Sequence, residues 1–310
     1  MNSLRSVRSY SWFGLSLLAL AAVPVRAEMK PFDLNMDRVS VSEAKGLAAG
    51  TYFVPGVNLE VSCEGDFTSQ NKGGGANAVA RGRYYVQGLD KAFVQDLARK
   101  IQDDLVAKLR ATGATVLTYA DLKDHPVVSG QGRKAPDEKW GLPTAKGFGA
   151  ITFLTAAPTD SQAYEHGMSA SAAWWMRTLA KEKDLVGILP TYTFRVPQMW
   201  GEKESSYSSA SASISVNPVM IFQGGQINAI NGKGGAPTIL IQEHGGRHAA
   251  EVTGKIRKLS EDTTNFSKSW GRTKADYLFT LDQEAFSDGV LRVAYAVNTM
   301  IADQVKKVRK

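Results

Sequence analysis

The sequence predicts an α/β fold in which helices pack on a mixed β-sheet. Three observations predict it. A helix with an apolar stripe leads directly into a β-rich run at 90–119, a second helix-then-strand unit follows at 171–196, and a strongly amphipathic helix closes the chain at 285–308. The α+β class stays open as an alternative, because the last third also contains a run of strands with no helix between them.

The amino terminus reads as a secretory signal peptide. Arg5 and Arg8 precede an apolar run at 12–23, and Val25 and Ala27 are the small residues that a signal peptidase recognises. A membrane span needs about 20 apolar residues, so this run is too short to be one. We expect cleavage after Ala27, with 28–310 forming a single α/β domain that is soluble and located in the periplasm or outside the cell.

Charge and cysteine content restrict the partners. Cleavage removes three arginines and no acid, so the net charge falls from +7 to +4. No dense basic stripe with interleaved aromatics is visible, which argues against a nucleic-acid partner. Cys63 is the only cysteine, so no intramolecular disulfide forms, and it lies too far from the cleavage site to be a lipoprotein anchor.

The first half of the mature chain contains the clearest element. Apolar residues recur every four positions from Phe93 to Leu109, and Gly113 is suited to a left-handed helix end before a strand at 114–119. Two strands are expected earlier, at 51–54 and 57–63. The glycine-containing stretch 64–78 between them and the helix is interpreted as a flexible loop, because no helix opens directly from its glycines to form a phosphate site.

Residues 124–149 contain five glycines and three prolines and show no periodicity. We interpret this stretch as a long inserted loop, and long loops often carry binding residues. Trp140 within it is a candidate binding residue, either as an exposed aromatic or as an anchor that holds the loop to the body.

The second half begins with a strand at 150–154, a helical region at 161–183 and a strand at 192–196 that Pro190 is expected to bend or break. Serines alternate with small apolar residues at 207–216, and further strands are expected at 219–222, 238–242 and 277–281. We interpret the alternating run and the next two strands as an antiparallel meander.

The stretch 242–251 supplies the only metal-site candidates. His244 and His248 are four residues apart, with Glu251 close by, and such a spacing holds a metal on one helical face. Gly245 and Gly246 lie between the two histidines and argue against a helix. The pattern favours a polar loop over a metal site, and no cofactor is predicted.

The order strand, helix, strand, long loop, strand, helix, strand resembles that of periplasmic α/β modules, namely the amino-terminal domain of the Tol–Pal translocation protein and the curli-export lipoprotein. The resemblance covers 93–119, 175–194 and the later strands, although this chain lacks the cysteine after the signal that lipid-anchored members have. It implies a role in binding or assembly in the cell envelope, without chemistry of its own.

We therefore expect an exported, non-enzymatic binding or assembly module whose partner is an envelope protein or a surface polymer. No catalytic residues are assigned. One alternative is an exported hydrolase, possibly metal-assisted through the 242–251 loop. Another is a self-assembling protein that forms homo-oligomers through a strand edge, because long alternating strands such as 207–216 are prone to edge pairing.

Overall fold

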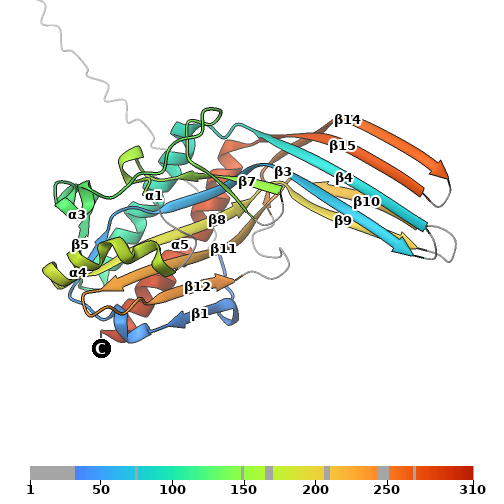
Figure 1. Ribbon diagram of the computed structural model, residues 1–310. Helices are drawn as coiled ribbons and strands as arrows, with labels where there is room; N and C mark the ends of the chain where they lie inside the picture. Colours follow the sequence, from blue (N-terminus) through green and yellow to red (C-terminus); the bar gives the residue numbers. More distant parts are fainter. Residues whose placement is uncertain are drawn as a thin grey trace, which may run out of the picture.

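The computed structural model describes residues 32–73, 76–147, 150–164, 170–205, 210–242, 251–267 and 270–309 (Figure 1). Its α-helices are α1 (Lys91–Ala111), α2 (Tyr119–Leu122), α3 (Pro126–Ser129), α4 (Arg177–Lys183) and α5 (Gln283–Val308). Short 3-10 helices are η1 (Met36–Arg38), η2 (Ala44–Leu47), η3 (Asp160–Gln162) and η4 (Ala170–Met176). In the described part of the chain, no helix is long and apolar enough to cross a membrane.

The strands fall into two sheets. They are β1 (Val39–Ser42), β2 (Thr51–Val54), β3 (Asn58–Gly73), β4 (Ala76–Gln87), β5 (Thr115–Thr118), β6 (Thr144–Lys146), β7 (Ala150–Ala156), β8 (Val186–Arg195), β9 (Gln198–Ser205), β10 (Ala210–Asn217), β11 (Val219–Asn231), β12 (Thr238–Gln242), β13 (Glu251–Val252), β14 (Gly254–Ser267) and β15 (Trp270–Leu281). The larger, 13-stranded sheet has the main order β1-β12-β11-β8-β3-β4-β15-β14, and β9 and β10 pair only with each other.

The large sheet is mixed, as the sequence predicts. Strands β2 and β5, β3 and β8, and β4 and β15 pair in parallel, whereas β8, β11, β12 and β1 form an antiparallel series. Because α1 and α5 pack on this sheet and α5 closes the described chain, the α/β class is confirmed.

Helix α1 begins and ends where its sequence predicts. The Asp90 side chain accepts a hydrogen bond from the Phe93 amide at 2.9 Å and caps the helix, and Gly113 has a φ of 82° just beyond its end. The stripe that includes Leu97, Ile101 and Leu105 is fully buried. Strand β5 follows at once and pairs with β2.

The sheet carries a core on each face. On one face, α1 and α5 cover side chains such as Tyr192 and Phe194 of β8 in the main core. On the other face, η4 and α4 cover Phe53, Leu189 and Ile230 in a smaller core. Successive residues of β2 and β8 alternate between the two cores, which is the period of two expected of strands buried on both faces.

Two details of the second helix-then-strand unit differ from the sequence prediction. Its helical region is divided into η3, η4 and α4, and the chain turns into β8 at Asp184, which has a left-handed φ of 49°. Pro190 does not break β8. On the β11 side of the strand, Pro190 pairs with Ile227. On the opposite side, β2 pairs with 186–187 and β3 pairs with 191–194, so Pro190 falls between the two pairings. Proline is tolerated at such an interruption between two strand pairings, because it has no amide to donate.

The largest departure from the sequence prediction is a projection of long strands, which we call the distal extension (Figure 1, right). It consists of the outer parts of β3 (66–73), β4 (76–83), β14 (259–267) and β15 (270–276), together with the β9–β10 hairpin. The prediction of a loop over 64–78 is therefore wrong, because β3 and β4 pair from Glu64 with Tyr85 to Gly73 with Ala76. The alternating run at 210–217 belongs to this hairpin and not to the antiparallel series of the large sheet.

Candidate functional site

The candidate metal ligands lie outside the described residues or at the start of a described range. His244 and His248 are outside the described residues, and Glu251 opens β13, where only its backbone pairing with Met220 is described. Among the residues that are described, no group of three His, Cys, Asp or Glu side chains is placed to hold a metal ion. The structure therefore tests neither the polar loop that the sequence favours nor the less favoured metal site.

Trp140, the predicted binding residue of the long loop, lies beside a hollow of about 570 Å³ at the base of the distal extension. The indole is half-buried and packs against the main core. The hollow is also lined by Tyr85 of β4 and by the turn that leads from β4 into α1. Trp140 therefore anchors the loop and also contributes to a concave surface.

The Lys139 side chain covers the two aromatic rings of this hollow. Its ammonium lies 4.7 Å from the centre of the Trp140 ring and 5.7 Å from that of Tyr85, and it forms a 2.7 Å ion pair with Glu64 of β3. The hydrogen bond to Glu64 raises the pKa of Lys139 above its ordinary value. Because Lys139 already occupies the ring faces, these contacts fasten the loop to β3 and β4.

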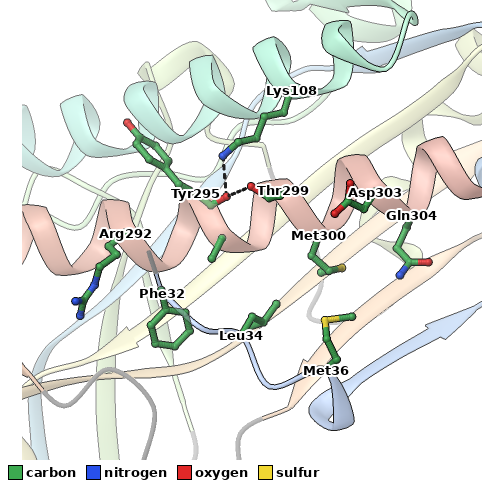
Figure 2. A pocket seen from close by; sticks show the side chains of 11 residues that line it. Phe32, Leu34, Met36, Lys108, Arg292, Tyr295, Thr299, Met300, Asp303 and Gln304 are labelled. Carbon is green, nitrogen blue, oxygen red and sulfur yellow. Dashed lines mark hydrogen bonds between the residues drawn. The ribbon is translucent and has the colours of Figure 1, made fainter. Parts of the chain in front are cut away.

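A second hollow, of about 580 Å³, lies between α5 and the segment that precedes β1 (Figure 2). Phe32, Leu34 and Met36 line one wall, and Met300 and Tyr295 of α5 line the opposite wall. Lys108 extends from α1 to the middle of this stretch of α5, where its ammonium donates to the Tyr295 carbonyl at 2.8 Å. The lining is mainly apolar with a charged rim, which makes this hollow a packing groove for the amino-terminal segment.

The distal extension is a two-layered structure in which β9 and β10 lie across β3 and β4 (Figure 1). Two glycines permit the close approach. A Cβ at Gly82 of β4 would stand 2.8 Å from the Met199 methyl carbon, and one at Gly201 of β9 would stand 2.5 Å from the Ser69 hydroxyl. Because glycine lacks a Cβ, the side chains of Met199 and Ile214 pack directly on Gly82, and those of Ser69 and Phe67 pack on Gly201.

The serine-rich face predicted from 207–216 points away from this contact. Ser213 and Ser215 of β10 donate to the Glu202 carboxylate of β9 at 3.4 and 2.7 Å, and the Trp200 indole donates to it at 3.2 Å. These hydrogen bonds, with that from Ser215 the strongest, lower the pKa of Glu202. The serines therefore form a solvated cross-strand network around one carboxylate.

The extension also presents two strand edges. Within the described part of the chain, β14 pairs only with β15, and the ladder between β3 and β7 ends at Asp66, so 67–73 pair only with β4. Leu259 of β14 is 49% exposed and stands at a β-bulge between Lys258 and Ser260. Lysines and bulges are devices that limit indiscriminate edge pairing.

Sequence reasoning missed the extension, although a signal for it exists. Small residues alternate with polar ones along β4, where Ala78, Ala80 and Gly82 face the hairpin and Asn77 and Arg81 face outward. This alternation has the period of two expected of a strand, but its inward-facing residues are small and only weakly hydrophobic.

Comparison of the chain with protein-family models, with curated proteins and with solved structures finds no match.

Proposed function

We propose that this protein is an exported, non-enzymatic binding or assembly module of the cell envelope. The observation that carries the proposal is the distal extension, which projects from a body that has its own two cores. The predicted signal peptide over 1–27 supports export, and the resemblance in element order to periplasmic α/β modules supports an envelope role.

The extension adds exposed strand beyond the body, and only its base shares the main core, through Met199 with Phe67 and Ile214 packed against it. The helices α1, α5 and α4 already cover both faces of the sheet at the other end. Long strands with open edges expose backbone amides and carbonyls that bind other chains readily. The exposed edges of the extension can pair with a strand of another protein, and we therefore assign partner binding to the extension.

The test places a photo-crosslinking amino acid at position 259, on the edge of β14, in the full chain expressed in its own cell. A matched variant carries it at position 174, where Trp174 is 42% exposed on the body. We expect a discrete adduct from position 259 and none from position 174. Equal labelling at both positions, or no adduct at 259, contradicts the proposal. Amino-terminal sequencing of the purified protein checks export, for which Glu28 is the expected first residue.

The open edges also favour a second candidate, self-assembly. Strand β14 and the outer part of β3 run parallel to each other at opposite edges of the extension, because both are antiparallel to neighbours that are themselves parallel. A head-to-tail contact joins two different edges and builds a ring or a filament. Adducts at multiples of the mass of the chain, with matching particles in light scattering, support it, and a monodisperse monomer at high concentration contradicts it.

A further inference from the structure

A polar trough of about 410 Å³ runs along the outer face of the distal extension, on the side away from the β9–β10 hairpin. It crosses four strands, β3, β4, β15 and β14. Three cations line it, Arg81 of β4 and Arg272 and Lys274 of β15, and all three are exposed.

The cations stand closer together than a sheet surface favours. Lys274 lies directly opposite Arg81 in the parallel ladder, and Arg272 is two residues along the same strand, a rise of about 7 Å. Among the ion pairs of the described residues, none involves these three side chains. Like charges placed opposite each other on neighbouring strands are destabilising, so this arrangement costs stability in the unbound protein.

The neighbouring row of cross-strand residues on the same face has its cation placed between carboxylates. There Arg83 lies between Asp66 and Asp276, and its guanidinium forms a 2.7 Å ion pair with Asp66. In the trough the corresponding row reads Thr68, Arg81, Lys274 and Asp262, so that two cations meet in the middle. Asp262 is the single carboxylate in the lining and lies opposite Lys274, so it partly offsets that cation, whereas the other cross-strand neighbour of Arg81 is the uncharged Thr68.

The remaining lining indicates what kind of anion fits. Thr68, Gln70 and Asn77 offer a hydroxyl and two amides, and the Gln70 amide donates to the Asn77 carbonyl at 3.3 Å. Groups that both donate and accept complement sugar hydroxyls, while Arg and Lys bind carboxylates. A lipid surface fits less well, because interfacial binding requires apolar side chains to insert and Val79 is the only large apolar residue in the lining.

We propose that this trough binds an acidic glycan, that is, a polysaccharide whose repeating units carry carboxylates. Its carboxylates bridge Arg81 and Lys274 and contact Arg272, and its hydroxyls hydrogen-bond Thr68, Gln70 and Asn77. Occupation removes the repulsion between the two facing cations. The site lies on the face of the extension, whereas the assignment of partners above rests on its edges, so either assignment stands without the other.

The test titrates the mature chain with polygalacturonate, a polymer of a uronic acid, and with neutral dextran as the control polymer, by calorimetry at low ionic strength. R81Q/K274Q should bind polygalacturonate about a hundredfold more weakly, because it removes two charge-assisted contacts and each is of the order of tenfold. The matched control K306Q/K307Q removes two exposed cations at the end of α5 and should leave binding unchanged.

Competition identifies the source of the anion. Polygalacturonate that fails to bind the wild-type chain, or that both double variants weaken equally, overturns the proposal. Inorganic phosphate that competes at equal charge concentration indicates a site for small anions and overturns the glycan assignment. Binding to anionic phospholipid vesicles that polygalacturonate does not displace overturns it in favour of a membrane surface.

The melting temperature gives a second readout. If the trough cations stabilised the fold, replacing one of them would lower the melting temperature, whereas a binding role predicts that it rises. Arg81 lies between Lys274 and the uncharged Thr68, so R81Q relieves repulsion without removing an attraction, and it should raise the melting temperature of the unbound protein while weakening polygalacturonate binding. In the wild-type chain, polygalacturonate should raise the melting temperature, and in R81Q it should raise it less. An R81Q variant that melts lower than the wild type and binds equally well contradicts the role.

Discussion

At the scale of single residues, a buried polar network centred on Asn298 joins the helices of the body to its sheet. Asn298 of α5 is completely buried and donates to the Ile101 carbonyl at 3.0 Å and to the Asp104 carboxylate at 2.8 Å. Its carbonyl accepts a hydrogen bond from the buried Tyr192 hydroxyl of β8. One side chain thus joins both long helices to the central strand, and low dielectric makes such a network sensitive to the loss of any member.

Asn298→Ala should lower the free energy of unfolding by about 3 kcal/mol, because it leaves buried partners unsatisfied and opens a small cavity. Urea unfolding measures the change. The control is Thr299→Ala at the next, exposed position, which should cost about 0.5 kcal/mol or less. Similar losses for the two variants would show that the buried network does not stabilise the body.

Cys63 should be inert in the folded protein. The thiol is fully buried, and burial, with a contribution from the Glu64 charge, raises its pKa to about 12. The reactive thiolate is therefore scarce at neutral pH. A disulfide-exchange reagent at pH 8 should label no thiol in the native protein and one per chain in denaturant. Full labelling under native conditions would contradict the burial.

At the scale of elements, local sequence determines helix α1, whereas contacts between distant segments determine the distal extension. Helix α1 follows from its own sequence, since its cap, its apolar stripe and its glycine stop are all local. The extension depends on contacts between strands that are far apart in the chain. Its layers fit because glycine occupies both close approaches, at Gly82 and Gly201. Here a single methyl group decides whether two elements pack.

Gly201→Ala should loosen the hairpin of β9 and β10, because the new Cβ would stand 2.5 Å from the Ser69 hydroxyl and 2.6 Å from its Cβ. Overpacking of this kind costs about 1–3 kcal/mol. Hydrogen exchange should quicken in 198–217 while the protection of α1 and α5 is retained. Gly50→Ala is the control, since its Cβ meets nothing within 4 Å, and its exchange should match that of the wild type. Unchanged protection of the hairpin in G201A would refute the close packing.

At the scale of the whole molecule, three carboxylates that are stabilised in their charged form contribute to acid stability. The pKa of Asp96 is lowered by Lys100, that of Asp121 by the Thr118 amide, and that of Asp160 by Lys91. Because these pKa values are lower in the folded than in the unfolded chain, the stability they contribute is complete above the unfolded values and is lost as pH falls through the folded ones.

The melting temperature should therefore change little between about pH 7 and pH 5 and fall below about pH 4, where unfolded carboxyls titrate. Asp121→Asn removes the charged acceptor of the Thr118 amide, so this variant should be less stable at pH 7 and should lose less on acidification. Calorimetric scans of both proteins from pH 7 to pH 3 measure the difference. Parallel curves would exclude a contribution from Asp121.

The candidate surfaces were only partly accessible from the sequence. Trp140 was expected either at the surface or as an anchor, and it proves to be half-buried beside a hollow, with Lys139 across its ring. The trough was not foreseen, because Arg81 and Lys274 are almost two hundred positions apart in the chain and meet only through the parallel ladder of β4 and β15. A charge pattern across strands becomes visible once the register is known.

By itself, the sequence determined the α/β class, the ends of α1 and the closing helix. These features are encoded by apolar residues at helical spacing, by an acidic cap and by a glycine, all within one segment. Only the tertiary structure decided that the strands outside the body form a two-layered extension with a basic trough. Alanine, glycine and serine carry little transfer free energy, so their strands form a stable layer only when a second layer, distant in the chain, packs directly on them.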